Sequence, residues 1–194
     1  MRVLSPLTLG ISALFLYGCT SAATPGAAVL PPLPTHETYD APGDRRLTPF
    51  LGDWTVSASV FPPAGGEAAR FDGEAGFWPA LDGRSLRETL TLDGFRSTST
   101  LGFSPIRGRY ELVQIDNSTG GQVWMVGLWS ADGKTLELEP AEEGQLDGLG
   151  FAAMRWEYRF IESGQLVKTI RVRDEAGGVW RVQSEYEYTR LYLR

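Results

Sequence analysis

The chain has 194 residues, and its 24 acidic and 18 basic side chains give a formal net charge of -6. This acidic balance argues against nucleic-acid binding, because phosphate contacts require a basic surface. The sequence contains a single cysteine, which excludes an intramolecular disulfide bond.

The N-terminus carries a short apolar stretch with the features of a targeting segment. Residues 1–18 combine Arg2, an apolar run over residues 4–17 and a small residue directly before Cys19. This pattern resembles a bacterial lipoprotein signal peptide. The resemblance implies that Cys19 becomes the lipidated first residue of the mature chain and anchors it to the membrane. Thr20 follows where an aspartate would signal inner-membrane retention, so the resemblance favours the outer membrane.

Residues 19–46 are predicted to form the lipidated cysteine and a flexible linker. They are rich in alanine, proline and small polar residues, and proline prevents regular hydrogen bonding along the chain. His36, the single histidine, lies in this segment. Its position argues against Ser-His-Asp and Cys-His catalysis, histidine-ligated haem and most zinc sites. We therefore expect no cofactor and no metal.

From residue 47 to 194, apolar and polar residues alternate with the period of a β-strand. Glycine-containing turn signals such as Asp82-Gly83, Asp93-Gly94 and Asp132-Gly133 separate the segments. The pattern predicts ten strands, at Trp54–Val60, Phe71–Trp78, Ser85–Leu92, Arg96–Phe103, Arg109–Asp116, Gln122–Ser130, Thr135–Glu139, Ala153–Ile161, Leu166–Arg173 and Val179–Thr189.

Short strands joined in sequence by tight turns indicate an all-β antiparallel meander. A twisted sheet of about ten strands has exposed edges unless it closes, so we expect a barrel. We expect one folded domain over residues 47–194, because a chain of this length buries enough surface for one core.

Two terminal motifs strengthen the barrel interpretation. Gly52-Asp53-Trp54 opens the first predicted strand, and Tyr188-Thr189-Arg190 closes the last. They resemble the termini of calycins, the superfamily of lipocalins and fatty-acid-binding proteins, in which a Gly-x-Trp packs under an arginine of the final strand. The resemblance implies that Arg190 stacks on Trp54 and closes one end of the barrel.

The folded region as a whole also resembles an uncharacterised bacterial calycin-like family, domain-of-unknown-function family fifteen-seventy-nine. The resemblance covers about residues 47–190 and implies a fold but no activity. The matching segments are Phe50-Leu51-Gly52-Asp53-Trp54, Leu81–Leu86, Gly102–Pro105, Tyr110 with Asp116-Asn117, Gly127 with Asp132-Gly133-Lys134, and Tyr188-Thr189-Arg190. Gln114 departs from the aromatic residue that members often carry before the Asp-Asn turn.

Strand parity predicts which side chains point into the barrel. On the last strand the inward set is Trp180, Val182, Ser184, Tyr186 and Tyr188. On the eighth strand it is Met154, Trp156, Tyr158 and Phe160. The expected interior is therefore strongly aromatic.

Two charged residues interrupt the inward faces. Glu88 shares a face with leucines of the third strand, and Lys168 shares a face with Leu166 and Ile170. An unpaired charge inside a barrel costs several kcal/mol, so both groups must pair, meet water or lie at the mouth. They either extend outwards from a packed core or form, with Trp156, Tyr158 and Tyr186, the lining of a ligand pocket.

Other candidate sites have weaker signals. The acidic segment Glu137–Asp147 lacks the spacing of a calcium-binding loop, so we interpret it as a solvated connection. Parity places Glu157 and Glu185 outside the barrel, which leaves Glu88 without a partner acid for hydrolysis. The sequence thus favours a protein that is not an enzyme.

Two functions remain open. The first is a membrane-anchored lipoprotein that binds a small apolar or amphipathic ligand in its barrel. The alternative is a structural or assembly lipoprotein that has a filled barrel and holds a partner through its outer surface.

Overall fold

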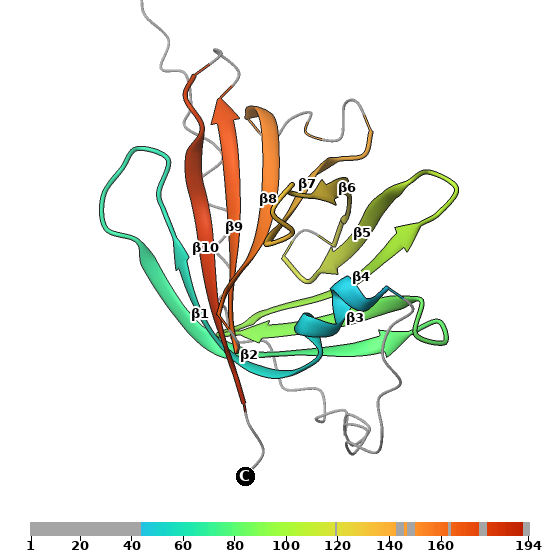
Figure 1. Ribbon diagram of the computed structural model, residues 1–194. Helices are drawn as coiled ribbons and strands as arrows, with labels where there is room; N and C mark the ends of the chain where they lie inside the picture. Colours follow the sequence, from blue (N-terminus) through green and yellow to red (C-terminus); the bar gives the residue numbers. More distant parts are fainter. Residues whose placement is uncertain are drawn as a thin grey trace, which may run out of the picture.

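A computed structural model of the chain describes residues 44–118, 120–142, 146, 150–162, 164–174 and 178–191. A short 3-10 helix, η1 (Arg45–Phe50), precedes ten strands (Figure 1). The strands are β1 (Gly52–Val60), β2 (Ala69–Ala80), β3 (Ser85–Leu92), β4 (Phe95–Ser104), β5 (Arg109–Asp116), β6 (Gln122–Trp129), β7 (Thr135–Pro140), β8 (Phe151–Glu162), β9 (Gln165–Asp174) and β10 (Arg181–Arg190).

Each strand pairs antiparallel with its neighbours in sequence, and β1 pairs with β10 to close the barrel. The predicted all-β meander and its closure are therefore confirmed. The turns use glycines at positive φ, such as Gly94 at 81° and Gly133 at 69°, a conformation that other residues adopt only with strain.

Two inward-facing glycines let neighbouring strands approach closely. A Cβ atom added to Gly73 on β2 would lie 2.0 Å from the backbone oxygen of Thr91, and one added to Gly127 on β6 would lie 1.7 Å from that of Glu137. Neither position can carry a side chain without moving the adjacent strand. Glycines at such points are typical of the sharp bends that a small barrel requires.

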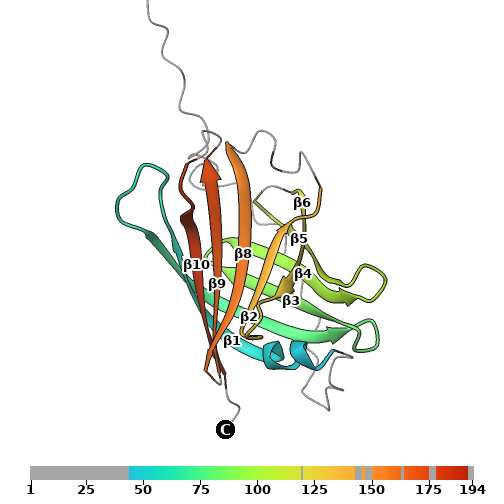
Figure 2. The same ribbon diagram turned by 45° about the horizontal axis from the view of Figure 1, so that its top comes forward.

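The helix η1 closes one end of the barrel and was not expected from the sequence. Asp44 caps it by accepting a hydrogen bond from the Arg46 amide. Leu47 and Phe50 are fully buried, and the Phe50 ring packs against Phe160 with ring centroids 4.8 Å apart. Figure 2 shows η1 in cyan at the lower end of the barrel, and we call this the closed end.

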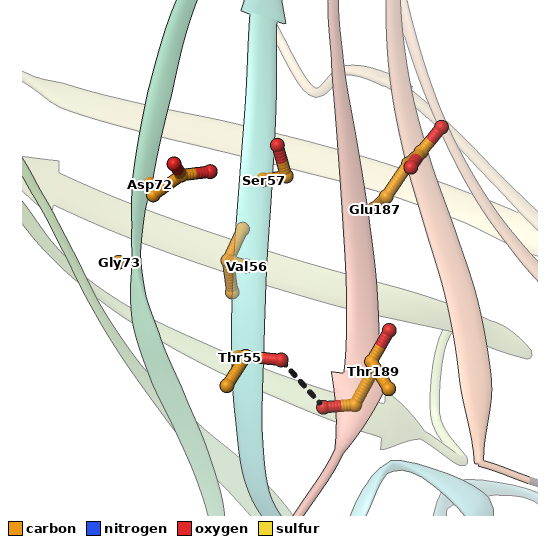
Figure 3. A pocket seen from close by; sticks show the side chains of 7 residues that line it. All are labelled: Thr55, Val56, Ser57, Asp72, Gly73, Glu187 and Thr189. Carbon is orange, nitrogen blue, oxygen red and sulfur yellow. Dashed lines mark hydrogen bonds between the residues drawn. The ribbon is translucent and has the colours of Figure 1, made fainter.

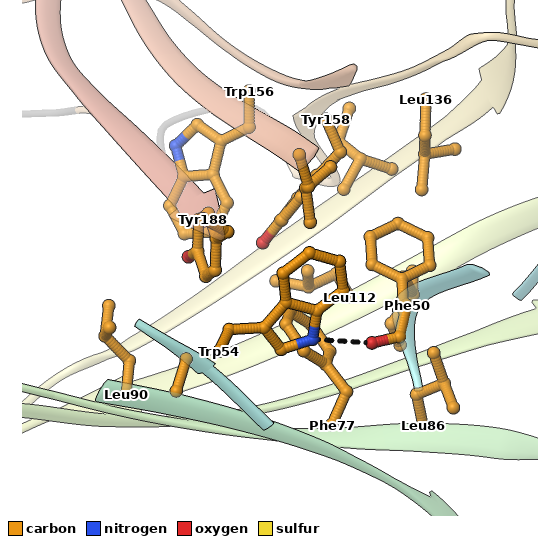
Figure 4. Close-up of a cluster of buried hydrophobic side chains, with 14 of the residues drawn as sticks. Phe50, Trp54, Phe77, Leu86, Leu90, Leu112, Leu136, Trp156, Tyr158 and Tyr188 are labelled. Atoms are coloured by element: carbon orange, nitrogen blue, oxygen red, sulfur yellow. Dashed lines mark hydrogen bonds between the residues drawn. The ribbon is translucent and has the colours of Figure 1, made fainter. Parts of the chain in front are cut away.

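The core fills the barrel above η1. Figure 4 shows Phe50, Trp54 and Phe77 meeting Leu86 and Leu112 in this layer. The indole of Trp54 donates a 2.9 Å hydrogen bond to the Phe50 carbonyl, which attaches η1 to β1. This contact satisfies the one polar atom of a fully buried side chain.

The predicted parity of the last strand is wrong at its beginning. A register shift lies between Val182 and Ser184, so Val182 pairs with outward-facing Arg171. Trp180 instead lies against two arginine side chains, with Arg155 5.3 Å and Arg173 5.5 Å from its ring centroid. One extra residue in the strand reverses the inward and outward positions. Parity therefore holds only from Ser184 onwards.

In the part of the chain that the structure describes, no helix is long and apolar enough to cross a membrane. Cys19 and most of the predicted linker lie outside the described residues.

Candidate functional site

Glu88 and Lys168 both lie inside the barrel, where their side chains are 3% and 2% exposed. Glu88 on β3 is directly opposite Ser99 on β4, and Ser99 is opposite Gln114 on β5. Cross-strand partners share a face of the sheet, so these three side chains form a row on one inner wall. Ser99 donates a 3.3 Å hydrogen bond to the Gln114 side-chain oxygen.

Two tyrosines on the facing wall approach the Glu88 carboxylate. Tyr188 on β10 donates a 2.9 Å hydrogen bond to Oε1, and Tyr158 on β8 lies 3.5 Å from Oε2. Burial, followed by the negative charge of Glu88, raises the pKa of both tyrosines well above the ordinary value. Both hydroxyls therefore stay protonated and available as donors.

Lys168 on β9 lies between Tyr158 of β8 and Tyr186 of β10 in the sheet. Its ammonium is 4.2 Å from the ring centroid of Trp156, 5.1 Å from that of Tyr158 and 5.6 Å from that of Tyr186. Burial lowers the pKa of Lys168, and the nearby charge of Glu88 partly opposes this effect. These rings stabilise the charge through their π faces. We call Glu88, Ser99, Gln114, Tyr158, Lys168 and Tyr188 the polar cluster.

The end of the barrel opposite η1 differs from the closed end in the burial of its inward side chains. Six inward-facing side chains there pack on the core yet remain only half-buried: Phe71, Phe95, Val123, Met154, Ile170 and Tyr186. Their cross-strand partners include Ala58 and Leu92, which are buried in the core. These side chains are less completely enclosed than the core residues next to them, and we call this the open end.

The closed end is held by contacts between η1 and the strands. The guanidinium carbon of Arg190 lies 4.5 Å from the Trp54 ring centroid, and the same side chain donates to the Pro49 carbonyl. Tyr110 donates to the Asp44 carboxylate. Burial opposes ionisation of Asp44, but hydrogen bonds from Arg46 and Tyr110 lower its pKa overall. These contacts make the closed end structural.

A hollow of about 280 Å³ lies on the outer wall, over β1, β2 and β10 (Figure 3). Its lining includes Thr55, Ser57 and the acids Asp72 and Glu187, and Thr55 donates to the Thr189 carbonyl. It offers neither an apolar enclosure nor a cation to a ligand. We therefore place the candidate site in the interior.

The remaining charged candidates lie outside the barrel. Glu157 accepts from Arg171 at 3.0 Å on the outer face of β8 and β9. Among the described residues no group of three histidine, cysteine or acidic side chains is placed to hold a metal ion. The acidic segment Glu137–Asp147 lies partly outside those residues.

Sequence reasoning missed part of the polar cluster. Ser99 and Gln114 were not selected, although each shares the inward face of its strand with a buried leucine, Leu101 or Leu112. Parity placed each on a face, but only the cross-strand register brings them beside Glu88. Ser97, whose buried hydroxyl has no partner among the described residues, was missed for the same reason.

A closed ten-stranded antiparallel barrel with a short helix across one end and a polar cluster inside defines a calycin-like barrel protein. The chain belongs to the family described as Protein of unknown function (DUF1579), whose profile it matches over residues 42–190.

Solved structures resemble this chain at low sequence identity. The crystal structure of Rv2717c from M. tuberculosis superposes with a TM-score of 0.54 at 19% identity, covering 79% of this chain and all of that one. A protein of unknown function from the DUF3598 family of Nostoc punctiforme has a TM-score of 0.49 at 13% identity, over 75% of this chain and 49% of the other.

The S-type phycobiliprotein lyase CPES from Guillardia theta has a TM-score of 0.48 at 10% identity, over 75% of this chain and 90% of the other. No curated protein matches the chain.

Proposed function

We propose that this protein binds a small amphipathic molecule inside its barrel. The observation that carries the proposal is the ring of half-buried inward apolar side chains at the open end, directly above a polar cluster. Small-molecule sites combine such apolar walls with a few convergent polar groups. The apolar part of the ligand packs on Phe71, Ile170 and their neighbours, and its polar end reaches Lys168 and Glu88.

A neutral fluorescent probe tests this proposal. N-phenyl-1-naphthylamine should gain fluorescence when added to the purified protein, because its rings leave water for the barrel. Ile170→Asn should weaken the binding, since Ile170 faces inward at the open end. Leu128→Asn should have no effect, because Leu128 is 57% exposed on the outer wall. Absence of binding by the unaltered protein would exclude the proposal.

The location of the protein forms the second part of the proposal. The resemblance of residues 1–18 to a lipoprotein signal peptide supports lipidation at Cys19 and attachment to the bacterial envelope, on the outer membrane. The barrel then acts as a membrane-attached binding protein. The sequence carries no catalytic pattern, so we propose binding rather than catalysis.

A second candidate function is assembly through the outer surface. The outer face of β5 and β6 exposes Ile115 and Leu128, 55% and 57% accessible, with the apolar pair Val113 and Trp124 between them. Exposed apolar groups that gather on one face are typical of contact sites. Paired Ile115→Asn and Leu128→Asn changes should then release a partner in cross-linking experiments and leave probe binding intact. Lost probe binding would contradict this candidate.

A further inference from the structure

The ammonium of Lys168 lies in the barrel interior and is stabilised by aromatic rings rather than by a protein acceptor. Although the side chain is 2% exposed, no hydrogen bond or ion pair joins it to any residue that the structure describes. Three aromatic rings surround it, the nearest centroid being that of Trp156 at 4.2 Å. Rings stabilise the charge but leave three N–H donors unused. An ammonium in this position takes its acceptor from water or from a ligand.

Glu88 does not supply that acceptor. Its carboxylate lies close enough to affect Lys168 electrostatically, but it is hydrogen-bonded to Tyr188 and approached by Tyr158 instead. A carboxylate offers about four acceptor positions, so the two tyrosines leave capacity for a further donor. The interior thus presents a free donor group and a partly free acceptor group of opposite charge.

Gln114 and Ser97 also carry polar atoms that lack a hydrogen-bond partner among the described residues. The Gln114 oxygen accepts from Ser99, whereas its amide nitrogen donates to no residue in the described part of the chain. The buried hydroxyl of Ser97, on the same strand as Ser99, also lacks a partner. Burying the Ser97 hydroxyl without a partner costs free energy, because it forfeits its hydrogen bonds to water.

From this charge arrangement we infer that the polar cluster selects a ligand whose head group is uncharged overall and carries both an acceptor and a donor. The primary carboxamide is the simplest member of this class. Its oxygen would accept from Lys168 while its NH₂ group donates to Glu88, and the attached apolar chain would extend to the open end. This inference rests on the proposed function and names its ligand class.

Charged head groups match the cluster less well. A carboxylate gains an ion pair with Lys168 but meets the negative charge of Glu88 in an interior that screens charge weakly. An alkylammonium gains an ion pair with Glu88 but is repelled by the positive charge of Lys168. A like charge without compensation is unfavourable in a buried site. An uncharged dipolar group satisfies both residues and avoids this repulsion.

The test compares decanamide, decanoate and decylamine as competitors for N-phenyl-1-naphthylamine at neutral pH. Their chains have equal length, so differences report the head group. The amide should bind about tenfold more tightly than either charged compound, as expected for one additional charge-assisted hydrogen bond. Glu88→Gln should shift the preference towards decanoate, and Lys168→Met should shift it towards decylamine.

The matched controls are Glu187→Gln and Lys134→Met, which change the same charges at exposed positions. They should leave the order of the three competitors unchanged. Circular dichroism and retained probe binding show whether each variant is folded. If Glu88→Gln does not fold, Glu88→Ala replaces it, and if Lys168→Met does not fold, Lys168→Gln replaces it.

The outcomes separate the two proposals. If the probe binds and the three compounds compete equally, or decanoate competes best with the unaltered protein, the selection for an uncharged head group is wrong while ligand binding stands. If interior and exposed variants change the order alike, the polar cluster does not select the ligand. If neither probe nor competitor binds, the proposed function itself fails.

Discussion

The Tyr188 hydroxyl donates a 2.9 Å hydrogen bond to Oε1 of Glu88, across the interior from β10 to β3. These strands are not neighbours in the barrel, because β1 and β2 lie between them. The contact therefore joins two walls through side chains alone and is fully buried. A buried carboxylate is tolerated only when such donors replace the water it has lost.

Tyr188→Phe should lower the free energy of unfolding by about 1.5 to 3 kcal/mol, the usual contribution of a hydrogen bond to a charged group. Urea denaturation followed by tryptophan fluorescence measures the change. Tyr186→Phe is the matched control, because Tyr186 has no hydrogen bond to Glu88 in the structure. Equal losses in the two variants would show that the Glu88 contact contributes no specific stability.

Removal of the Trp54 indole at the closed end should lower the free energy of unfolding more than Tyr188→Phe does. Trp54→Ala should cost about 3 to 5 kcal/mol, since transfer and cavity contributions add for a large buried aromatic ring. Arg190→Ala should cost less, because Arg190 as a whole is only partly buried. The two changes should couple by about 0.5 to 2 kcal/mol in a double-mutant cycle, as expected for a cation over an indole. Additive losses would contradict an energetic contact at 4.5 Å.

Stability should fall in alkaline solution. The pKa values of Tyr158 and Tyr188 are raised by burial and by Glu88, so above about pH 10 the unfolded chain loses these protons and the folded chain retains them. Their stabilising contribution is complete below that pH and declines as the pH rises through the folded-state pKa values. Denaturation at increasing pH should show this decline, and Tyr158→Phe with Tyr188→Phe should reduce it. An unchanged slope in that double variant would contradict the assignment.

Lys168 has the opposite dependence, because burial lowers its pKa. The cost of burying the ammonium is complete below its folded-state pKa and disappears as the pH rises through the unfolded value of about 10.4. Lys168→Met should therefore be more stable than the unaltered protein at neutral pH, and the difference should narrow in alkali. Thermal unfolding at several pH values measures it. A stability difference between the two proteins that grew as the pH rose would contradict this prediction.

Cys19→Ser should release the protein from the membrane fraction or leave it unprocessed, because acyl chains supply the anchoring energy. Fractionation with immunoblotting gives the distribution, and metabolic labelling with a fatty acid shows whether the cysteine is acylated. Thr20→Ser is a matched control that should remain in the membrane fraction. Unchanged partitioning of the Cys19→Ser variant would exclude this anchor.

Local pattern alone predicted the barrel and the inward position of Glu88 and Lys168. Alternation with period two specifies the face of every strand, and glycine-containing turns specify antiparallel neighbours. Both signals are short in range, so they can be recognised in a single sequence. They fail where one residue is added, as at the register shift between Val182 and Ser184, because the extra residue is invisible to a periodic pattern.

The tertiary structure decided which polar groups meet. Glu88 and Tyr188 are 100 positions apart, and their contact depends on the curvature and register of all the strands between them. The same holds for η1, whose fully buried Phe50 lies outside any strand pattern and fills the end of the closed barrel. Composition and alternation determined that the interior is aromatic with two charges. Only closure of the barrel determined that Lys168 has rings for neighbours and no acceptor among the described residues, because side-chain contacts across a barrel depend on shape rather than on sequence order.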